Sequence, residues 1–233
     1  MELSIGIPAY NEDKWIGKTL EEIGQYLEEK QIDWEIIVVD DGSADSTIEV
    51  VRGSKGVRLL CNERNMGKGY SVRRGVLAAE GNYIIIIDAD LPFPISELEK
   101  VLNVLKEGWD IAIGSKYLQK SEKITDVPWY RLYGGRLFNL LARLLLIRGI
   151  RDTQCGLKVF KQKVAKDLFT RQRVNGFAFD VEVLYLAQSM GYKIKELPVK
   201  WKYVFKERGC SFLLRGLSMV LDLFRIKFMK YDV

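Results

Sequence analysis

The sequence predicts an α/β fold in which a mostly parallel, doubly wound sheet carries helices on both faces. Short apolar runs alternate with helical patterns over residues 3–116, at the spacing of strand–helix–strand units. Two of these runs, at 36–39 and 84–87, are apolar at successive positions, as a strand buried on both faces requires. The 233 residues, 48% of them hydrophobic, suffice for one large domain around a buried core.

The elements of the first half follow from these patterns. Strands are expected at Leu3–Pro8, Glu35–Asp40, Val57–Asn62, Tyr83–Asp88 and Asp110–Ser115. Helices are expected at about residues 14–30, 45–52, 68–79 and 96–107. Each of these helices would then serve as the crossover connection that parallel strands need.

Beyond about residue 116 the pattern changes. An arginine-studded leucine helix is expected at about 129–149, a short strand at Gly156–Phe160, helices near 161–170 and 178–190, a strand at Lys193–Trp201, a basic loop at 202–209 and a long C-terminal helix. There is no internal repeat, so residues 1–233 are expected to form a single domain.

Composition excludes several classes of function. The formal net charge of +5 is too small to favour nucleic-acid binding. There is no histidine, so proton transfer must fall to Asp, Glu, Tyr, Lys or Cys, and any metal site is expected to be rich in oxygen ligands. Cys61, Cys155 and Cys210 match neither a disulfide framework nor a zinc pattern and are expected to be reduced thiols.

Polar residues gather where the predicted strands end, which is where open parallel sheets bind their ligands. The residues at these strand ends are Pro8, Ala9, Tyr10, Asn11 and Glu12 after the first strand, Asp40 and Asp41 after the second, and Asp88, Ala89 and Asp90 after the fourth. Such side chains also cap helices, as Ser43 or Asp45 is expected to do, but capping does not explain paired acids at two strand ends.

The spacing of Asp88 and Asp90 lets both carboxylates reach one divalent cation from an extended turn. Oxygen ligands suit Mg²⁺ or Mn²⁺, which complete their coordination with substrate phosphates and water. A pyrophosphate leaving group needs such a charge as its bond to a sugar breaks.

Five short motifs occur in order over residues 3–116: Ile-Pro-Ala-Tyr-Asn-Glu, Val-Val-Asp-Asp-Gly-Ser, Asn-Met-Gly-Lys-Gly, Asp-Ala-Asp-Leu and Ile-Gly-Ser-Lys-Tyr. Together they resemble glycosyltransferase family 2, whose members have a GT-A fold. The resemblance implies that residues 1–116 bind a nucleotide sugar, that 117–209 form the acceptor side and that 210–233 form an amphipathic helix.

The resemblance also implies roles for single residues. The donor site would comprise Pro8, Ala9, Tyr10, Asn11, Glu12, Asp40, Asp41, Asp88 and Ala89, with Asp90 as the principal metal ligand. Lys68 would lie close to the nucleotide, although a solvated lysine at a helix start is the alternative. The family's usual Gly-Ser-Arg is Gly-Ser-Lys here, so Lys116 must supply its positive charge without a bidentate fork.

The second half is similar to the polyprenyl-phosphate sugar synthases, most of all to dolichyl-phosphate β-glucosyltransferases. The similarity lies in Arg-Asp-Thr-Gln-Cys-Gly at 151–156 and Phe-Ala-Phe-Asp-Val-Glu at 177–182. Mannose synthases of this group often carry a glutamine where Pro92 stands, which disfavours a strict mannose synthase.

The resemblance implies an inverting transferase that moves a hexose, with glucose from UDP-glucose as the leading donor, to polyprenyl or dolichyl phosphate. Asp152 is the candidate for orienting or activating the acceptor. Arg131 and Arg208 are candidates for binding the acceptor phosphate or donor pyrophosphate, with a surface arginine as the alternative for each.

Other functions stay open at this point. They are a dolichyl-phosphate mannose synthase that uses GDP-mannose, a family 2 transferase acting on a cell-surface glycan, and a membrane-associated nucleotide-binding module without activity. A nicotinamide dehydrogenase is disfavoured because the first strand–helix turn lacks G-x-G-x-x-G.

Two helical segments, at about 129–149 and 210–233, are amphipathic. In the first, Arg136, Asn139 and Arg143 share one stripe and leucines cover the remaining arc. Both segments are expected to lie in a membrane surface, with packing on the domain or in a dimer interface as the alternative. Without a signal peptide or a spanning segment, the protein is expected to be cytoplasmic and peripheral on the cytoplasmic face of a membrane; its oligomeric state is open.

Overall fold

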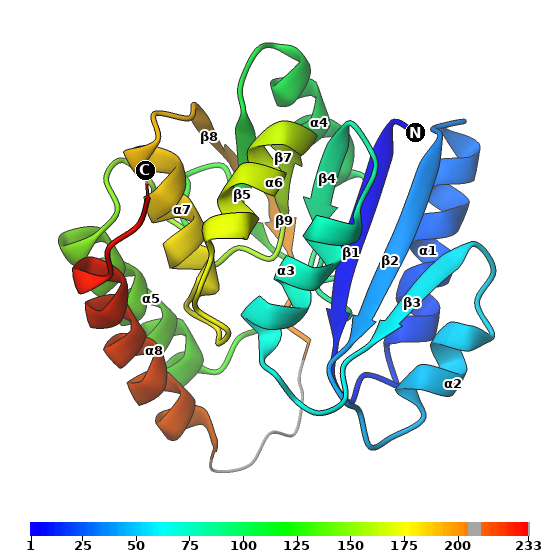
Figure 1. Ribbon diagram of the computed structural model, residues 1–233, viewed down its shortest axis with the longest axis horizontal. Helices are drawn as coiled ribbons and strands as arrows, with labels where there is room; N and C mark the ends of the chain where they lie inside the picture. The colour runs from blue at the N-terminus through cyan, green and yellow to red at the C-terminus, as the bar shows by residue number, and fades with distance from the viewer. Residues whose placement is uncertain (205–210, 233) are drawn as a thin grey trace.

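The computed structural model describes residues 1–204 and 211–232. Its centre is a seven-stranded, mostly parallel sheet in the order β3-β2-β1-β4-β7-β5-β8, and a second sheet pairs β6 with β9 (Figure 1). The strands are β1 (Leu3–Ala9), β2 (Trp34–Asp40), β3 (Val57–Cys61), β4 (Tyr83–Ile86), β5 (Ile111–Ser115), β6 (Glu122–Lys123), β7 (Lys158–Lys161), β8 (Ile194–Pro198) and β9 (Lys200–Trp201). The helices are α1 (Ile16–Glu29), α2 (Thr47–Arg52), α3 (Lys68–Ala78), α4 (Glu97–Lys106), α5 (Trp129–Leu145), α6 (Gln162–Arg171), α7 (Phe179–Ser189) and α8 (Ser211–Phe228).

Helices cover both faces of the large sheet, as predicted. Successive side chains of a strand point to opposite faces, and the two hydrophobic cores divide β2 accordingly. Ile36 and Val38 belong to the core formed with α1 and α4. Ile37 and Val39 belong to the core formed with α3, α5, α6, α7 and α8. The unbroken apolar run of β2 is therefore explained by burial on both sides.

One strand runs against the others and determines where the second half lies. β7 is antiparallel to both neighbours, β4 and β5, and separates them. Ile86 at the end of β4 is paired with Lys158 at the start of β7. The chain therefore enters β7 at the carboxyl edge of the sheet, which brings residues 152–157 beside the end of β4.

The predicted single strand Lys193–Trp201 is wrong, because the segment forms two strands in different sheets. β8 pairs with β5 as far as Pro198, opposite Ser115. β9 then pairs with β6. Pro198 has no N–H to donate and marks the place where the chain leaves the large sheet.

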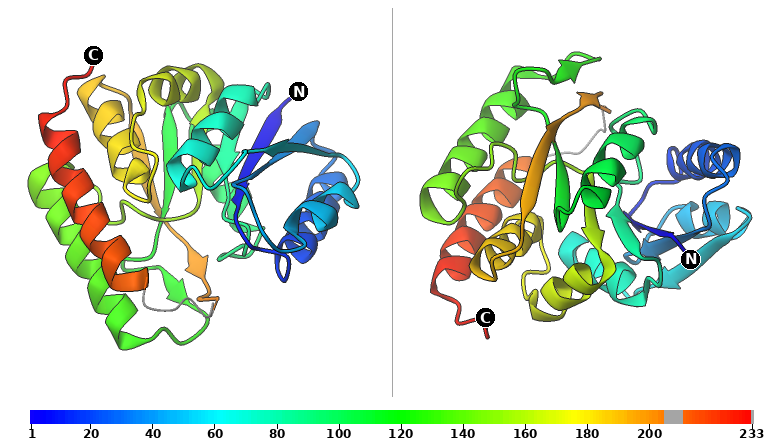
Figure 2. Two further views of the ribbon diagram at one scale, coloured as in Figure 1. Left: turned by 60° about the horizontal axis from the view of Figure 1, so that its bottom comes forward. Right: turned by 90° about the horizontal axis from the view of Figure 1, so that it is seen from above.

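The helices α5 and α8 lie side by side at one end of the molecule (Figure 2). Phe138 and Ala142 of α5 and Leu223 and Ile226 of α8 are buried in the core. Both helices therefore pack on the domain, which was the alternative to lying in a membrane surface. The predicted polar stripe of α5 is partly wrong, because Asn139 is buried with 5% of its surface exposed.

Each of these helices also exposes a second, apolar stripe. On α5 it consists of Trp129, Tyr133, Leu137, Leu140 and Leu144. On α8 it consists of Leu217, Leu221, Phe224 and Phe228. Both stripes have helical periodicity. Among the described residues, no helix has the length and apolar character needed to cross a membrane.

Candidate active site

Asp88 and Asp90 follow β4 and line two adjoining pockets. The larger pocket has a volume of about 990 Å³ and the smaller about 210 Å³. Among the predicted donor-site residues, those that line the larger pocket are Pro8, Ala9, Tyr10, Asn11, Glu12, Asp41, Lys68, Asp88, Ala89 and Asp90. The predicted donor residues thus come together, and the aspartate pair stands between two cavities.

Asp40 and Asp41 are held mainly by backbone N–H groups. Asp40 is fully buried and does not line the larger pocket, contrary to the prediction; its Oδ2 accepts hydrogen bonds from the N–H groups of Gly42 and Ser43. Its Oδ1 is buried without a hydrogen-bond partner among the described residues. Asp41 lines the pocket, and its carboxylate accepts hydrogen bonds from the N–H groups of Met66 and Gly67.

Gly42 shows why the turn after β2 needs glycine. Its φ of +73° lies in the left-handed region, and a Cβ there would stand 2.7 Å from the carbonyl carbon of Arg64. Asn62 donates a hydrogen bond of 2.7 Å to Oδ1 of Asp41 and joins the same turn to β3. The wall of the larger pocket is therefore fixed by local geometry.

Lys68, the first residue of α3, forms an ion pair with Asp88. Its Nζ lies 2.6 Å from Oδ1 of Asp88, and its side chain is 23% exposed, so it is not a solvated lysine. Burial alone would lower the pKa of Lys68, but the carboxylates of Asp88 and Asp180 outweigh burial and raise that pKa. Lys68 is a firmly charged ammonium directed at a predicted metal ligand.

A second, deeper ion pair lies behind Lys68. Nζ of Lys158 is 2.7 Å from Oδ1 of Asp180 and donates a hydrogen bond of 2.6 Å to the carbonyl oxygen of Cys155. The side chain of Lys158 is 2% exposed and that of Asp180 is 10% exposed. Burial raises the pKa of Asp180, while Lys158 and Lys68 oppose the increase.

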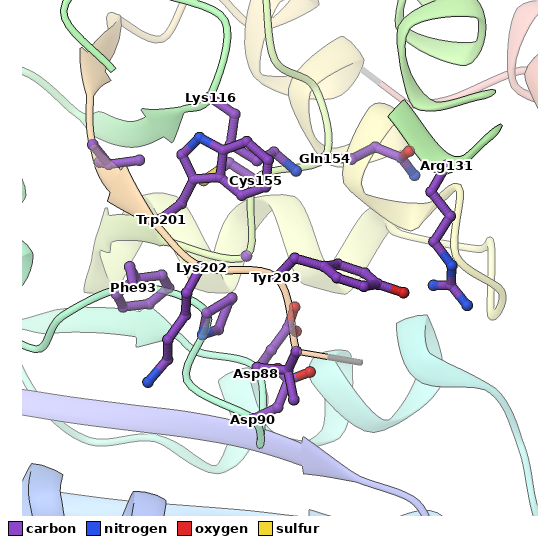
Figure 3. A pocket seen from close by; sticks show the side chains of 14 residues that line it. Asp88, Asp90, Phe93, Lys116, Arg131, Gln154, Cys155, Trp201, Lys202 and Tyr203 are labelled. Carbon is purple, nitrogen blue, oxygen red and sulfur yellow. The ribbon is translucent and has the colours of Figure 1, made fainter. Parts of the chain in front are cut away.

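The smaller pocket adjoins the same aspartate pair. Besides Asp88 and Asp90 it is lined by Pro92, Phe93, Lys116, Arg131, Gln154, Cys155, Gly156, Val199, Trp201, Lys202, Tyr203 and Val204. Figure 3 shows Lys116 beside Trp201 at one end, the two aspartates at the other, and Arg131 next to Tyr203. Lys116 and Arg131 thus bring two positive charges, as predicted, to a cavity that contains two carboxylates.

Asp152 lies behind this pocket and is not part of its wall. Its side chain is fully buried, and its carboxylate accepts hydrogen bonds from the backbone N–H groups of Lys116 and Gln154. Its Oδ2 is also 3.8 Å from Nζ of Lys116. Asp152 was expected to orient or activate the acceptor; because its carboxylate is fully buried, any such role must act through Lys116.

The charge on Lys116 follows from this arrangement. Burial alone would lower the pKa of Lys116, but Asp152 outweighs it, and the pKa is raised. Burial, followed by Asp152, raises the pKa of the neighbouring Cys155 to about 11. Cys155 is therefore a neutral thiol near pH 7 and is not an activated nucleophile.

The Asp152 segment is held in place from α5. The side-chain oxygen of Asn139 accepts hydrogen bonds from the N–H and the hydroxyl of Thr153. Gly156 lies directly against Asp88, because a Cβ on Gly156 would stand 2.6 Å from Oδ2 of that carboxylate. Glycine is therefore required at position 156 if the Asp88 carboxylate is to stay where it is.

The donor set at Asp88 and Asp90 fits a hard divalent cation. Both groups supply oxygen ligands, and Asp88 already attracts the cationic Lys68. No group of three or more His, Cys, Asp or Glu side chains suited to a metal exists within residues 1–204 and 211–232. A site of two carboxylates leaves room for the substrate phosphates that Mg²⁺ usually binds. Arg208 lies outside the described residues.

Some residues that line the pockets were missed. Phe177 and Arg215 line the larger pocket, and the guanidinium carbon of Arg215 is 5.7 Å from the centre of the Phe177 ring. Trp201 and Tyr203 line the smaller pocket. Phe177 is the first residue of the Phe-Ala-Phe-Asp-Val-Glu motif at 177–182, so the sequence did point to it. Arg215 is one polar position of an amphipathic helix, and nothing in the sequence distinguishes it as a pocket residue.

Comparison with known proteins agrees with this geometry. The model of glycosyl transferase family 2 matches residues 4–169. Dolichyl-phosphate beta-glucosyltransferase of Drosophila melanogaster is 37% identical over 243 residues, which cover 97% of this chain and 74% of that protein. The Homo sapiens protein of the same name is 38% identical over 221 residues, which cover 86% of this chain and 67% of that protein.

A solved structure supports the fold. The glucosyl-3-phosphoglycerate synthase of Mycobacterium tuberculosis in complex with Mn²⁺, UDP and glucosyl-3-phosphoglycerate has a TM-score of 0.74 at 21% sequence identity, over 99% of this chain and 81% of that chain. This likeness confirms the expected GT-A fold. The family model spans most of the chain, and the strand ends carry the motifs that led to the same family. The chain therefore belongs to glycosyl transferase family 2.

Proposed function

We propose that this family 2 enzyme transfers glucose from UDP-glucose to the phosphate of dolichol or another polyprenol, with inversion at the anomeric carbon and with Mg²⁺ or Mn²⁺ bound. The observation that carries the proposal is that Asp88 and Asp90 line both pockets. A donor in one pocket and an acceptor in the other would meet at this pair. Similarity over most of the chain to dolichyl-phosphate beta-glucosyltransferases supports this choice of donor sugar and acceptor.

The larger pocket has the chemistry for a nucleoside diphosphate sugar. Tyr10 and Glu12 offer an aromatic ring and a carboxylate for the base and ribose. Lys68 and Arg215 line the same pocket and supply positive charge for the diphosphate. Asp88 and Asp90 would hold the divalent cation, which supplies Lewis-acid stabilisation of the departing diphosphate.

The smaller pocket has the chemistry for the acceptor phosphate. Lys116 and Arg131 bind the phosphate and direct one of its oxygens toward the sugar. Asp152 acts behind Lys116, keeping the ammonium charged and oriented. The new bond joins this oxygen to the anomeric carbon, while the bond to the diphosphate breaks and UDP leaves with the electron pair. The attacking oxygen is already anionic, so a strong general base is not needed.

The apolar stripes of α5 and α8 would hold the enzyme on the cytoplasmic face of a membrane, where a polyprenyl phosphate is found. Leu144 and Phe228 are 73% and 78% exposed. Arg143, Arg225 and Lys227 are exposed on the same helices and suit anionic headgroups. The variant Leu144→Glu/Phe228→Glu should lose flotation with anionic vesicles, whereas Leu77→Glu, at an exposed leucine on α3, should not. Equal flotation of all three proteins would contradict the membrane surface proposed here.

The central test is product formation with purified protein, UDP-glucose, Mn²⁺ and dolichyl phosphate. A glucolipid should form, and Asp90→Ala should reduce its rate by about a thousandfold or more, as expected for loss of transition-state charge stabilisation. Asp126→Ala, at a fully exposed aspartate that lines neither pocket, is the matched control. Transfer from GDP-mannose only, transfer to a soluble glycan only, or UDP binding without turnover would each overturn the assignment.

A further inference from the structure

Lys68 occupies the position next to Asp88 where a divalent cation would otherwise be attracted. Its Nζ lies 2.6 Å from Oδ1 of Asp88. The other oxygen, Oδ2, faces the backbone at Gly156, where even a Cβ atom would stand only 2.6 Å away. The ammonium therefore already holds one of the two carboxylate oxygens that a divalent cation would use.

We propose that Lys68 is a built-in counter-cation, which holds Asp88 in the ligand-free protein and gives up this carboxylate only when a divalent cation and a diphosphate bind together. The inference rests on the proposed function for its cation and its nucleotide. It adds a regulatory role for a lysine of this chain: Lys68 suppresses binding of the cation alone.

The charges around Asp88 support the proposal that the cation and the diphosphate bind together. Lys158 and Asp180 form a close, neutral pair. The other two carboxylates that act on Lys68 are Asp88 and Asp90, and these two groups and Lys68 together carry one negative charge in excess. A divalent cation alone would leave one positive charge in excess, with Lys68 close to a dication. A nucleoside diphosphate makes the sum negative again, because it carries at least two negative charges.

Lys68 also has a second carboxylate within its reach. Asp180 is, after Asp88, the carboxylate that acts most strongly on the charge of Lys68. Nζ of Lys68 also lies 5.9 Å from the centre of the Phe177 ring. When Asp88 turns to a cation, the diphosphate becomes the counter-charge of Lys68, and the attraction of Asp180 for Lys68 persists.

The consequence is a specific pattern of binding. Mn²⁺ alone should bind weakly to the wild type, and UDP should strengthen its binding severalfold or more. Because linkage is reciprocal, Mn²⁺ should strengthen UDP binding by the same factor. Without the ammonium of Lys68, Mn²⁺ should bind more tightly in the absence of UDP. The factor by which UDP strengthens Mn²⁺ binding should then become smaller.

The test is Mn²⁺ binding measured by electron paramagnetic resonance of the unbound ion, with and without UDP, on the complete protein. Lys68→Met should bind Mn²⁺ alone about tenfold more tightly than the wild type, a size expected for one charge at a partly exposed site. Lys68→Arg keeps the charge and should stay close to the wild type. Lys30→Met, at an exposed lysine that pairs with Glu99, controls for the change in net charge.

The outcomes separate this inference from the proposed function. Thermal unfolding of each variant identifies any loss of structure, in which case Lys68→Gln replaces Lys68→Met. Equal Mn²⁺ affinity in the wild type and Lys68→Met, or an unchanged effect of UDP, would overturn the role of Lys68 and leave the glucosyl transfer intact. Tighter Mn²⁺ binding by Lys68→Met, together with a wild-type protein that fails to glucosylate dolichyl phosphate, would support the inference and refute only the proposed acceptor or donor. No Mn²⁺ binding by any variant, with or without UDP, would overturn both.

Discussion

The two halves of the chain hold their charged side chains in different ways. In the first half, Asp40 and Asp41 are held mainly by backbone N–H groups of the turns around them. In the second half, Asp152 lies against Lys116, the last residue of the first half, and Lys158 lies against Asp180, and the partners come from separate segments. Apart from the ion pair of Lys68 with Asp88, the geometry of the larger pocket therefore depends on local turns. The geometry around the smaller pocket depends on buried charges from separate segments of the chain.

The largest effect expected from this difference is on stability. Asp180→Asn leaves Lys158 buried with its charge no longer matched, because the side chain of Lys158 is 2% exposed. Breaking such a pair costs about 3–5 kcal/mol of unfolding free energy. Urea denaturation followed by circular dichroism measures this loss.

Two further variants give that measurement its controls. Asp126→Asn breaks the exposed pair with Lys123 and should cost less than about 1 kcal/mol. The double variant Lys158→Met/Asp180→Leu removes both charges and should recover most of the stability lost in Asp180→Asn. If Asp180→Asn lowers the unfolding free energy no more than Asp126→Asn does, the second half of the chain is not stabilised by its buried charge pair.

The same difference explains what the sequence could reveal. The motifs after β1, β2 and β4 were found because each is a short run next to an apolar strand, and parallel strands present their carboxyl ends at one edge. Asp41, Asp88 and Asp90 accordingly line one pocket, as expected. Asp40 was expected to line this pocket as well, but it does not. Neighbouring side chains of an extended segment point in opposite directions, so Asp40 points away from the pocket that Asp41 lines.

The acceptor side was harder to predict because its contacts are long-range. The antiparallel direction of β7 cannot be read from a run of four residues, yet it brings Gly156 beside Asp88. Asn139 shares a helical stripe with two arginines, but its amide is buried against Thr153. Asp152 was recognised as important, but its burial behind Lys116 depends on α5 and β8, which sequence spacing does not place.

A smaller effect, on activity, is expected where the two halves touch. Gly156→Ala places a methyl group 2.6 Å from Oδ2 of Asp88, so the carboxylate must move. A displacement of about 1 Å in a reacting site costs about a hundredfold in rate. Steady-state kinetics should show this loss in kcat/KM, with a much smaller change in unfolding temperature.

Gly24→Ala is the matched control for this substitution. Gly24 lies in α1, and a Cβ there meets no other atom within 4 Å. Alanine is the better helix former, so this variant should be as active as the wild type and slightly more stable. Full activity of Gly156→Ala would mean that the contact between the halves does not position Asp88.

The smallest effect expected is a pH dependence of the unfolding free energy, which arises in the second half of the chain alone. The hydroxyl of Tyr192 donates a hydrogen bond of 2.6 Å to Oδ2 of Asp167. This bond, followed by burial, raises the pKa of Tyr192 from 10.0 to about 12. A raised pKa means that the folded state holds the phenol proton more tightly than the unfolded state does. The stabilisation is therefore complete below pH 10 and is lost as the pH rises from 10 to about 12.

Tyr192→Phe should accordingly be less stable than the wild type at pH 8, by about 1 kcal/mol for one partly exposed hydrogen bond. The difference should shrink toward zero near pH 12, because the wild-type tyrosine then loses its proton and its bond to Asp167. Tyr133→Phe, at a tyrosine that is 62% exposed on α5, should show no such convergence. Urea unfolding at four or five pH values distinguishes the two variants. A stability difference for Tyr192→Phe that stays constant up to pH 12 would show that the phenol packs in the fold without acting as a donor to Asp167.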